Sequence, residues 1–243
     1  MRAVILAMGL AALGGDAIAE VRADLQRCSV LYGVAAIEPC TRAIESGALE
    51  GNERGMALFS RGFGYAARGE FDRAIADYTD AIRTTPDDAE FILGRGLAYQ
   101  NKGDLDGAIA DYTEAIRLKP DWADVFLNRG HLHILKGDAE QALADYNEAI
   151  RLKPDFPWAY HGRGIFHARR REIDQAIADF SMVIRLNPSM EGIFRDRGVL
   201  YESKGDTAQA IADYDEALRR KPDDTEALSR RGALSAKKDE NQG

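Results

Sequence analysis

Residues 103–121 read GDLDGAIADYTEAIRLKPD, and residues 137–155 read GDAEQALADYNEAIRLKPD. The same pattern recurs along most of the chain. Its closing proline returns every 34 residues without a slip, at Pro86, Pro120, Pro154, Pro188 and Pro222. A fixed period of roughly 20 to 50 residues is typical of stacked supersecondary units. The sequence therefore predicts a repeat protein that offers a surface for another polypeptide rather than a pocket for chemistry.

The residues that recur inside each repeat predict pairs of closely packed helices. We number each repeat from 1, starting at Gly55, Ala89, Ala123, Pro157 and Glu191, with a partial repeat from Thr225. Position 8 is always glycine, at Gly62, Gly96, Gly130, Gly164, Gly198 and Gly232. Because glycine inside a helix costs about 1 kcal/mol relative to alanine, this column indicates close approach of two helices. Position 20 is alanine and position 24 is tyrosine or phenylalanine, which predicts a core and not a cofactor site.

Glycines and short polar residues mark the expected helix ends. Gly69, Gly103, Gly137 and Gly205 are expected to end the first helix of their repeats in the left-handed conformation, and Arg171 stands at this place in the fourth repeat. The residue after each proline is expected to cap the next helix; these residues are Asp87, Asp121, Asp155, Ser189 and Asp223.

Residues 55–238 resemble tetratricopeptide repeats, with Gly at position 8, Tyr or His at 11, Ala at 20, Tyr or Phe at 24, Ala or Val at 27 and Pro at 32. The resemblance implies an all-α fold, a right-handed α-solenoid of antiparallel helix pairs. It also implies that the first helix of each pair, helix A, lines a concave groove. Residues 20–50 look like a divergent N-terminal helical hairpin, 55–224 form the five repeats, 225–238 look like a capping helix, and 239–243 are expected to be a flexible tail.

Charge argues against a nucleic-acid partner. The net charge is −8, and no basic patch stands out that could contact phosphates. Arginine fills position 7 and aspartate position 23 in every full repeat, for example Arg95 and Asp111. We interpret these columns as a ladder of ion pairs that supports the scaffold; a repeated anion-binding stripe is the functional alternative.

Residues 1–19 have the layout of a secretory signal peptide. Arg2 precedes a short apolar run, and small residues stand at Ala17 and Ala19 before an expected cleavage. The alternative is a buried N-terminal helix of the domain. Cleavage after Ala19 predicts a mature protein outside the cytoplasm, in a bacterial periplasm, without membrane insertion.

The two cysteines, Cys28 and Cys40, are expected to form a disulfide because an even count in an exported chain favours pairing. They are 12 residues apart, as are the glycine at position 8 and the alanine at position 20 of each repeat. Aligning Ala36 with Ala74 would instead place Cys40 under Tyr78, and two free buried thiols are the alternative to a disulfide.

In tetratricopeptide repeat proteins, the residues at positions 2, 5, 6, 9, 12 and 13 of helix A vary and face the groove. The candidate partner-binding residues are Phe59, Phe63, Leu93, Leu97, Leu127, Asn128, His131, His161, Arg169 and Arg195. An apolar lane with polar flanks is typical of a peptide or helix site. The N-terminal hairpin or a neighbouring subunit could fill it instead.

Two further sites are considered and set aside. The carboxylate clamp of some tetratricopeptide proteins is absent, since only Asn128 matches it. His131 and His161 could face each other across neighbouring helices, but two imidazoles without a third ligand make a poor zinc site. His133 and His167 are expected to be packing residues.

No arrangement of catalytic side chains stands out from the repeat pattern. We therefore expect a non-catalytic scaffold or adaptor, without cofactor or metal, that binds another protein or peptide segment. The alternative is a self-associating structural protein whose groove is filled by its own chain or by a second subunit, so a homodimer is possible.

Overall fold

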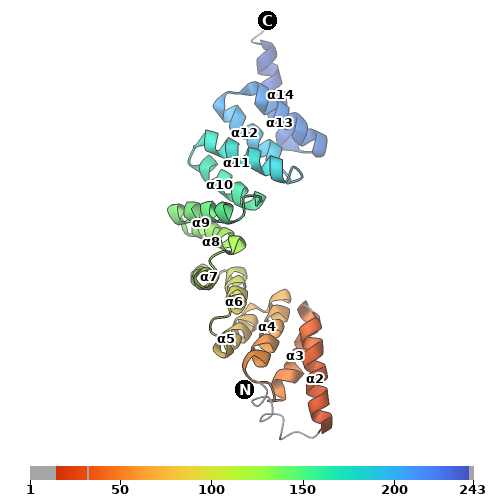
Figure 1. Ribbon diagram of the computed structural model, residues 1–243. Coiled ribbons are helices and arrows are strands. Elements are labelled where there is room, and N and C mark those ends of the chain that lie inside the picture. The colour runs from red at the N-terminus through yellow and green to blue at the C-terminus, as the bar shows by residue number, and fades with distance from the viewer. Residues whose placement is uncertain (1–14, 32, 241–243) are drawn as a thin grey trace. The chain divides into compact units, whose positions relative to one another are not determined.

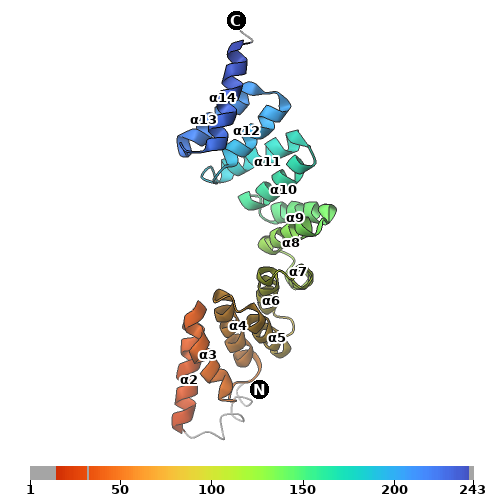
Figure 2. The same ribbon diagram turned by 180° about the vertical axis from the view of Figure 1, so that it is seen from behind.

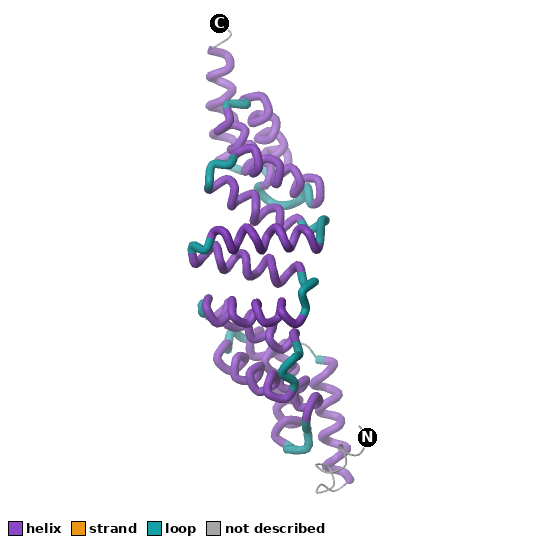
Figure 3. The backbone as a smooth tube through the Cα atoms, turned by 60° about the vertical axis from the view of Figure 1, so that its left-hand side comes forward, coloured by secondary structure: helices purple, strands orange, loops and turns teal. Residues whose placement is uncertain are grey.

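The computed structural model describes residues 15–31 and 33–240. Over these residues the chain is helical and contains no strand, as Figure 3 shows. The described residues fall into two compact parts that divide between Val125 and Phe126, and each part is considered by itself. Residues 1–14 of the expected signal peptide and residues 241–243 of the expected tail lie outside the described residues.

The N-terminal part begins with a helical hairpin and continues as paired helices (Figures 1 and 2). Its elements are α2 (Gly15–Val30), the 3-10 turn η1 (Gly33–Ala36), α3 (Ile37–Glu45), α4 (Gly51–Ala67), α5 (Phe71–Thr84), α6 (Ala89–Lys102) and α7 (Leu105–Leu118). From α2 to α7, each helix contacts the next one along the chain. The first two repeats therefore supply two helix pairs, α4 with α5 and α6 with α7.

The C-terminal part follows the same plan. Helix α8 (Ala123–Lys136) contains the boundary between the parts, and the elements after it are α9 (Ala139–Leu152), α10 (Pro157–Arg169), α11 (Ile173–Leu186), α12 (Ile193–Lys204), α13 (Thr207–Arg220) and α14 (Thr225–Glu240). From α9 to α14, consecutive helices contact each other. The predicted all-α solenoid of helix pairs is confirmed, with α4, α6, α8, α10 and α12 as A helices and α5, α7, α9, α11 and α13 as B helices.

The recurring glycine at position 8 allows the two helices of a repeat to approach closely. A Cβ atom added to Gly96 would lie 2.9 Å from the ring of Tyr112, the aromatic residue at position 24. Tyr112 and Ala108 at position 20 are fully buried. At Gly232 in α14 an added Cβ would meet nothing within 4 Å, and no B helix follows α14 among the described residues. The close contact therefore belongs to the helix pair and not to the helix alone.

The expected left-handed glycines are confirmed, whereas the expected N-caps are wrong. Gly69, Gly103, Gly137 and Gly205 have φ between 77° and 88°. The carboxylate of Asp88, not Asp87, accepts hydrogen bonds from the amides of Glu90 and Phe91 and caps α6. The remaining A helices and α14 also begin after other residues; the residues that precede them are Trp122, Phe156, Gly192 and Asp224. The loop between each proline and the next helix is longer than we expected, so the residue before that helix lies further along the chain.

The arginines at position 7 join the two helices of their own repeat. Arg95 donates from Nε and Nη2 to the two carboxylate oxygens of Asp111, both at 2.8 Å, and the other four full repeats show the same bidentate pair. In Arg95, Arg163 and Arg197 a third nitrogen, Nη1, also donates to a side chain of the preceding repeat, as in the 2.9 Å bond from Arg197 to Ser181. These aspartates are buried. The predicted ion pairs are present, and each joins the two helices of its repeat.

The N-terminal hairpin is a modified repeat in the same 34-residue register. The sulfur atoms of Cys28 and Cys40 lie 2.04 Å apart, at disulfide distance, and their Cα atoms are 4.8 Å apart. Helix α3 begins at Ile37, 34 residues before the start of α5 at Phe71. Cys28 and Cys40 therefore occupy positions 8 and 20 of a repeat that would begin at Val21, and the alternative alignment of Cys40 with Tyr78 is wrong.

A reversed ion pair holds the same hairpin. Asp24 on α2 accepts two hydrogen bonds from Arg42 on α3, at 2.8 Å from Nε and 2.7 Å from Nη2. In the full repeats the A helix supplies the arginine and the B helix the aspartate; here the order is exchanged. The bonds from Arg42 lower the pKa of the buried Asp24 carboxyl. Helix α2 also continues across the bond between Ala19 and Glu20, where cleavage is predicted; that cleavage stays a prediction.

Candidate functional site

Exposed apolar side chains gather on one face of the A helices. In the five repeats of the described chain, the large hydrophobic residues that are exposed lie only on A helices, at positions 2, 9 and 13; they are Met56, Phe63, Leu97, Leu135 and Trp158. Residues separated by 4, 7 or 11 positions share one face of a helix. The A helices therefore present an apolar face to solvent, and the B helices do not.

In the N-terminal part this face contains a hollow of about 420 Å³ between α4 and α6. Four of the predicted groove residues line it: Phe59, Phe63, Leu93 and Leu97. Phe63 and Leu97 are 50% and 37% exposed, so their side chains are available for contact. The ring of Trp122, which directly precedes α8, completes the lining.

The floor of this hollow depends on a second glycine in α6. A Cβ atom added to Gly94, at position 6, would lie 2.9 Å from the ring of Tyr78 and 3.0 Å from the ring of Phe59. Those two rings contact each other with centroids 5.6 Å apart. Burial raises the pKa of Tyr78, whose hydroxyl therefore stays protonated at neutral pH. A larger residue at position 6 would therefore collide with the two rings that line the hollow.

The C-terminal part contains a second hollow of about 250 Å³ between α8 and α10. His131, His161 and Arg169 line it, so the structure brings these three predicted residues together. Its walls are apolar side chains that include Ile134 and Ile165. Gly162 stands at position 6 here too; an added Cβ would lie 2.9 Å from the ring of Tyr146 and 3.2 Å from Nε2 of His131.

The two histidines of this hollow are neutral at pH 7. Desolvation lowers the pKa of His131, and the nearby His161 lowers it further. Desolvation also lowers the pKa of His161, although Asp196 opposes the shift. Each imidazole packs on an aromatic ring of the following B helix, His131 on Tyr146 at 5.6 Å between centroids and His161 on Phe180 at 5.8 Å. No group of three metal-binding side chains occurs among the described residues.

Arg169 lies at the end of this hollow. Its charge acts on the phenol of Tyr146: burial raises the pKa of Tyr146 to about 12, and Arg169 opposes the rise. Ile134, Phe166 and Arg169 also line a smaller hollow beside the first, so Arg169 stands on the rim that the two share.

The other three predicted groove residues lie elsewhere. Leu127 is 7% exposed and is buried, and Asn128 is half-buried; neither lines the hollow between α4 and α6 or the one between α8 and α10. Arg195 is held by acidic side chains, with Nη1 at 3.0 Å from Asp224 and Nη2 at 3.1 Å from Asp196. Arg195 is thus a link between α12 and the start of α14 in this structure.

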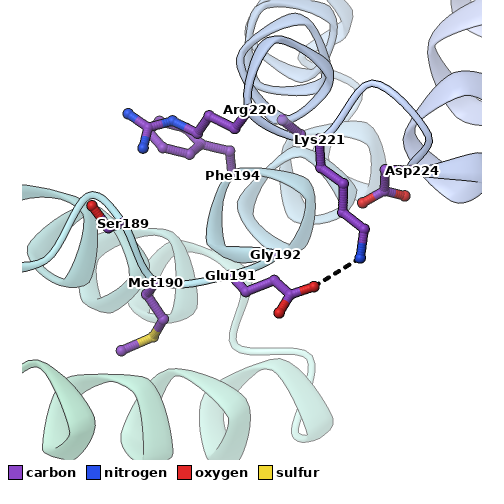
Figure 4. Close-up of a pocket in the computed structure, with 9 residues that line it drawn as sticks. Ser189, Met190, Glu191, Gly192, Phe194, Arg220, Lys221 and Asp224 are labelled. Carbon is purple, nitrogen blue, oxygen red and sulfur yellow. Dashed lines mark hydrogen bonds and ion pairs between the residues drawn. The ribbon is translucent and has the colours of Figure 1, made fainter.

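A third hollow lies at the start of α12 and the end of α13, and none of the predicted groove residues lines it (Figure 4). Its polar side chains satisfy one another. Lys221 Nζ lies 2.8 Å from a carboxylate oxygen of Glu191, and Arg220 donates to the carbonyl oxygen of Pro188 at 2.8 Å. No charged group at this hollow is left to recognise a ligand, so we do not include it in the candidate site.

The sequence reasoning missed the position 6 glycines and the aromatic floors beneath them. Gly94 and Gly162 differ from Ser60, Asn128 and Asp196 at the same position, and both hollows lie beside a glycine. An extra glycine inside a helix, which costs about 1 kcal/mol, is the signal that could have located them.

Comparisons with known proteins agree on the repeat. Models of the tetratricopeptide repeat match residues 64–123 and 164–234, and a TPR repeat model matches residues 130–170. No curated protein sequence matches the chain. No helix among the described residues has the length and apolar character required to cross a membrane.

Solved structures show the same architecture at low sequence identity. A crystal structure of YrrB, described as a TPR protein with an unusual peptide-binding site, is 24% identical with a TM-score of 0.65, covering 79% of this chain and 97% of that one. A crystal structure of MamA is 24% identical with a TM-score of 0.63, covering 66% and 94%. A tetratricopeptide repeat protein from Parabacteroides merdae is 19% identical with a TM-score of 0.66, covering 93% and 87%.

Proposed function

Because the chain belongs to the tetratricopeptide repeat family, we propose that it is a non-catalytic scaffold that binds a segment of another protein on the exposed face of its A helices. Repeats of this kind stack helix pairs to build extended binding surfaces. Membership of the family supports the role of a protein-interaction scaffold. We propose in addition which face binds and that this face holds a segment of another protein.

One observation carries the proposal: the exposed large hydrophobic side chains of the repeats lie on the A helices alone. If these residues served only to fold the repeat, they would be buried like Leu58 and Ile92. An exposed apolar patch with polar borders commonly marks a protein contact. The peptide-binding site named for YrrB gives a precedent on the same fold, though at an identity too low to transfer its ligand.

The hollow between α4 and α6 favours a segment that inserts apolar side chains. Its walls are aromatic and aliphatic, and Glu90 and Asn101 are the polar residues at its border. Either an extended strand or an amphipathic helix can present such side chains to a groove.

The experiment compares a groove variant with a matched surface variant. Phe63→Glu/Leu97→Glu places two charges in the hollow, and Val30→Glu/Leu228→Glu places two charges on exposed apolar residues outside it. We expect the groove variant to bind the partner that copurifies with the wild-type chain at least tenfold more weakly than the wild-type chain does. The control variant should bind this partner with unchanged affinity. Equal binding by both folded variants would exclude this face, and a partner that proves to be a second copy of the chain would support self-association instead.

We further propose that the chain is exported and cleaved after Ala19, in keeping with the signal-like residues 1–19 and the paired cysteines. Disulfides persist in oxidising compartments such as the bacterial periplasm. The mature protein should begin at Glu20. Recovery of the chain with an intact N-terminal region from the cytoplasm would contradict export and leave the binding proposal in place.

A further inference from the structure

The hollow between α8 and α10 carries a cation that the scaffold does not use. Arg169 is exposed, and among the described residues no carboxylate is paired with it. By contrast, the arginines at position 7 are bound by aspartates, and Arg170 is bound by Glu140 and Glu172. The same position 13 is Ala67, Asn101, Leu135 and Ser203 in the other repeats, so the charge belongs to this hollow and not to the repeat pattern.

The rest of the hollow is apolar or uncharged. His131 and His161 are neutral, no acidic residue lines the space, and the nearby Asp196 is bound by Arg195. At about 250 Å³ the hollow is smaller than the roughly 300 to 1,000 Å³ of small-molecule sites, which fits a single side chain better than a cofactor.

The charge of Arg169 and the apolar walls of the hollow lie at different heights along α10. Arg169 lies eight residues after His161 on α10, about 12 Å along a helix at 1.5 Å per residue. Ile165 lies between them. Ile165 is four residues before Arg169, about 6 Å along the helix. An extended segment spans at most about 3.6 Å per residue, so a carboxylate one or two residues from an apolar side chain beside Ile165 can reach Arg169.

We propose that this hollow receives one large apolar side chain of the bound segment while Arg169 pairs with the carboxylate of an aspartate or glutamate one or two residues further on. This inference rests on the proposed function, because it names the chemistry of the partner segment at the A-helix face. Unpaired positive charge beside an uncharged pocket supplies the charge complementarity that selects the acidic residue.

The test uses the full chain with ¹⁵N-labelled histidine and three small probes: N-acetyl-Leu-Glu-amide, N-acetyl-Leu-Gln-amide and N-acetyl-leucine. Nuclear magnetic resonance titration follows the imidazole signals of His131 and His161. We expect both signals to shift, with the Glu probe binding about three- to fivefold more tightly than the Gln probe, the range of an exposed ion pair.

Two variants assign the preference. Arg169→Gln should bind the Glu and Gln probes equally, whereas the control Arg171→Gln, which removes a positive charge from the same turn, should keep the preference. Equal affinities in the wild-type chain, a preference that survives Arg169→Gln, or unshifted histidine signals would overturn the inference. Tighter binding of N-acetyl-leucine than of the Glu probe would show that the site prefers a chain terminus, which also overturns it. The Phe63 and Leu97 variants test the proposed function separately, in the other part of the chain.

Discussion

Arg171 is the residue where the repeat pattern breaks at a cost in backbone strain. Among the described residues it alone, other than glycines, has a positive φ, at 61°, and it replaces the glycine that ends helix A in four other repeats. Left-handed backbone costs a non-glycine residue roughly 1 kcal/mol. Arg171→Gly should therefore stabilise the protein, by about 0.5 kcal/mol after the greater freedom of glycine in the unfolded chain is counted.

Chemical denaturation of the purified chain measures this effect. The reverse substitution Gly205→Arg, at the matching position of the fifth repeat, should destabilise by a similar amount. A lower midpoint for Arg171→Gly would show that the arginine side chain makes a stabilising contact that outweighs the strain.

Buried and exposed ion pairs should differ strongly in their contribution to stability. Asp111 is 6% exposed and is bound twice by Arg95, whereas Glu114 pairs with Arg117 on the surface of the same helix α7. Removing one partner of a buried pair leaves an uncompensated charge and costs about 3 kcal/mol. Removing one partner of a surface pair costs under about 1 kcal/mol.

We therefore expect Asp111→Ala to lower the denaturation midpoint several times more than Glu114→Ala does. Similar small effects from both substitutions would show that Arg95 regains solvent when its partner is lost, and that the ladder contributes little to folding.

His161 should make stability depend on pH below neutrality. Its pKa in the folded protein is lowered by desolvation, while the unfolded value is about 6.5. The unfolded chain then binds more protons than the folded chain, so stability falls as the pH drops below about 6.5 toward the folded pKa. In His161→Gln the denaturation midpoint should change less between pH 7 and 5 than it does in the wild-type chain. The same dependence of the midpoint on pH in both proteins would contradict this.

At the scale of elements, the cysteine pair should stabilise the N-terminal hairpin. A disulfide that closes a loop of this length contributes about 3 kcal/mol when it forms without strain. The variant Cys28→Gly/Cys40→Ala restores the glycine and alanine that the full repeats carry at these positions, so it keeps the packing pattern and removes the bond.

Hydrogen exchange of the native chain measures the consequence. We expect faster exchange in α2 and α3 of the variant, with no change in α10 to α13. Equal protection of α2 and α3 in both proteins would show that packing and the Asp24–Arg42 pair are sufficient to hold the hairpin.

The helix pairs could be predicted from the sequence more fully than the N-caps of the helices and the hollows between them. Proline spacing and the glycine, alanine and aromatic columns determine the pairs because each of these residues packs within its own repeat, as Gly96 does against Tyr112. The N-caps of α6 and α14 were misplaced because two neighbouring aspartates precede each helix, and the geometry selects the second, Asp88 and Asp224. The hollows were missed for a related reason, since they depend on how the glycine at position 6 meets rings from two other helices, as Gly94 meets Phe59 of α4 and Tyr78 of α5.

At the scale of the whole molecule, the chain combines a uniform scaffold with a varied binding face. The Arg–Asp pairs and the glycine contacts repeat in each part, whereas the A-helix face changes from Phe63 and Leu97 to His131 and Arg169. Scaffold residues recur because the two helices of every repeat pack in the same way. The A-helix face varies because a ligand makes different contacts along its length. The sequence could indicate which positions vary, but fold alone does not identify what they bind.

Site-specific photo-crosslinking in the native cell tests the central claim most directly. A crosslinking residue replaces, one at a time, Phe63, Leu97, Leu135 and Trp158 on the A helices, and the exposed Ala76 and Ala144 on the B helices as controls. The account predicts crosslinks to a defined segment of another protein from the A-helix positions and none from the controls. Crosslinks from the B-helix positions with equal yield, or crosslinks only to the chain itself, would contradict it.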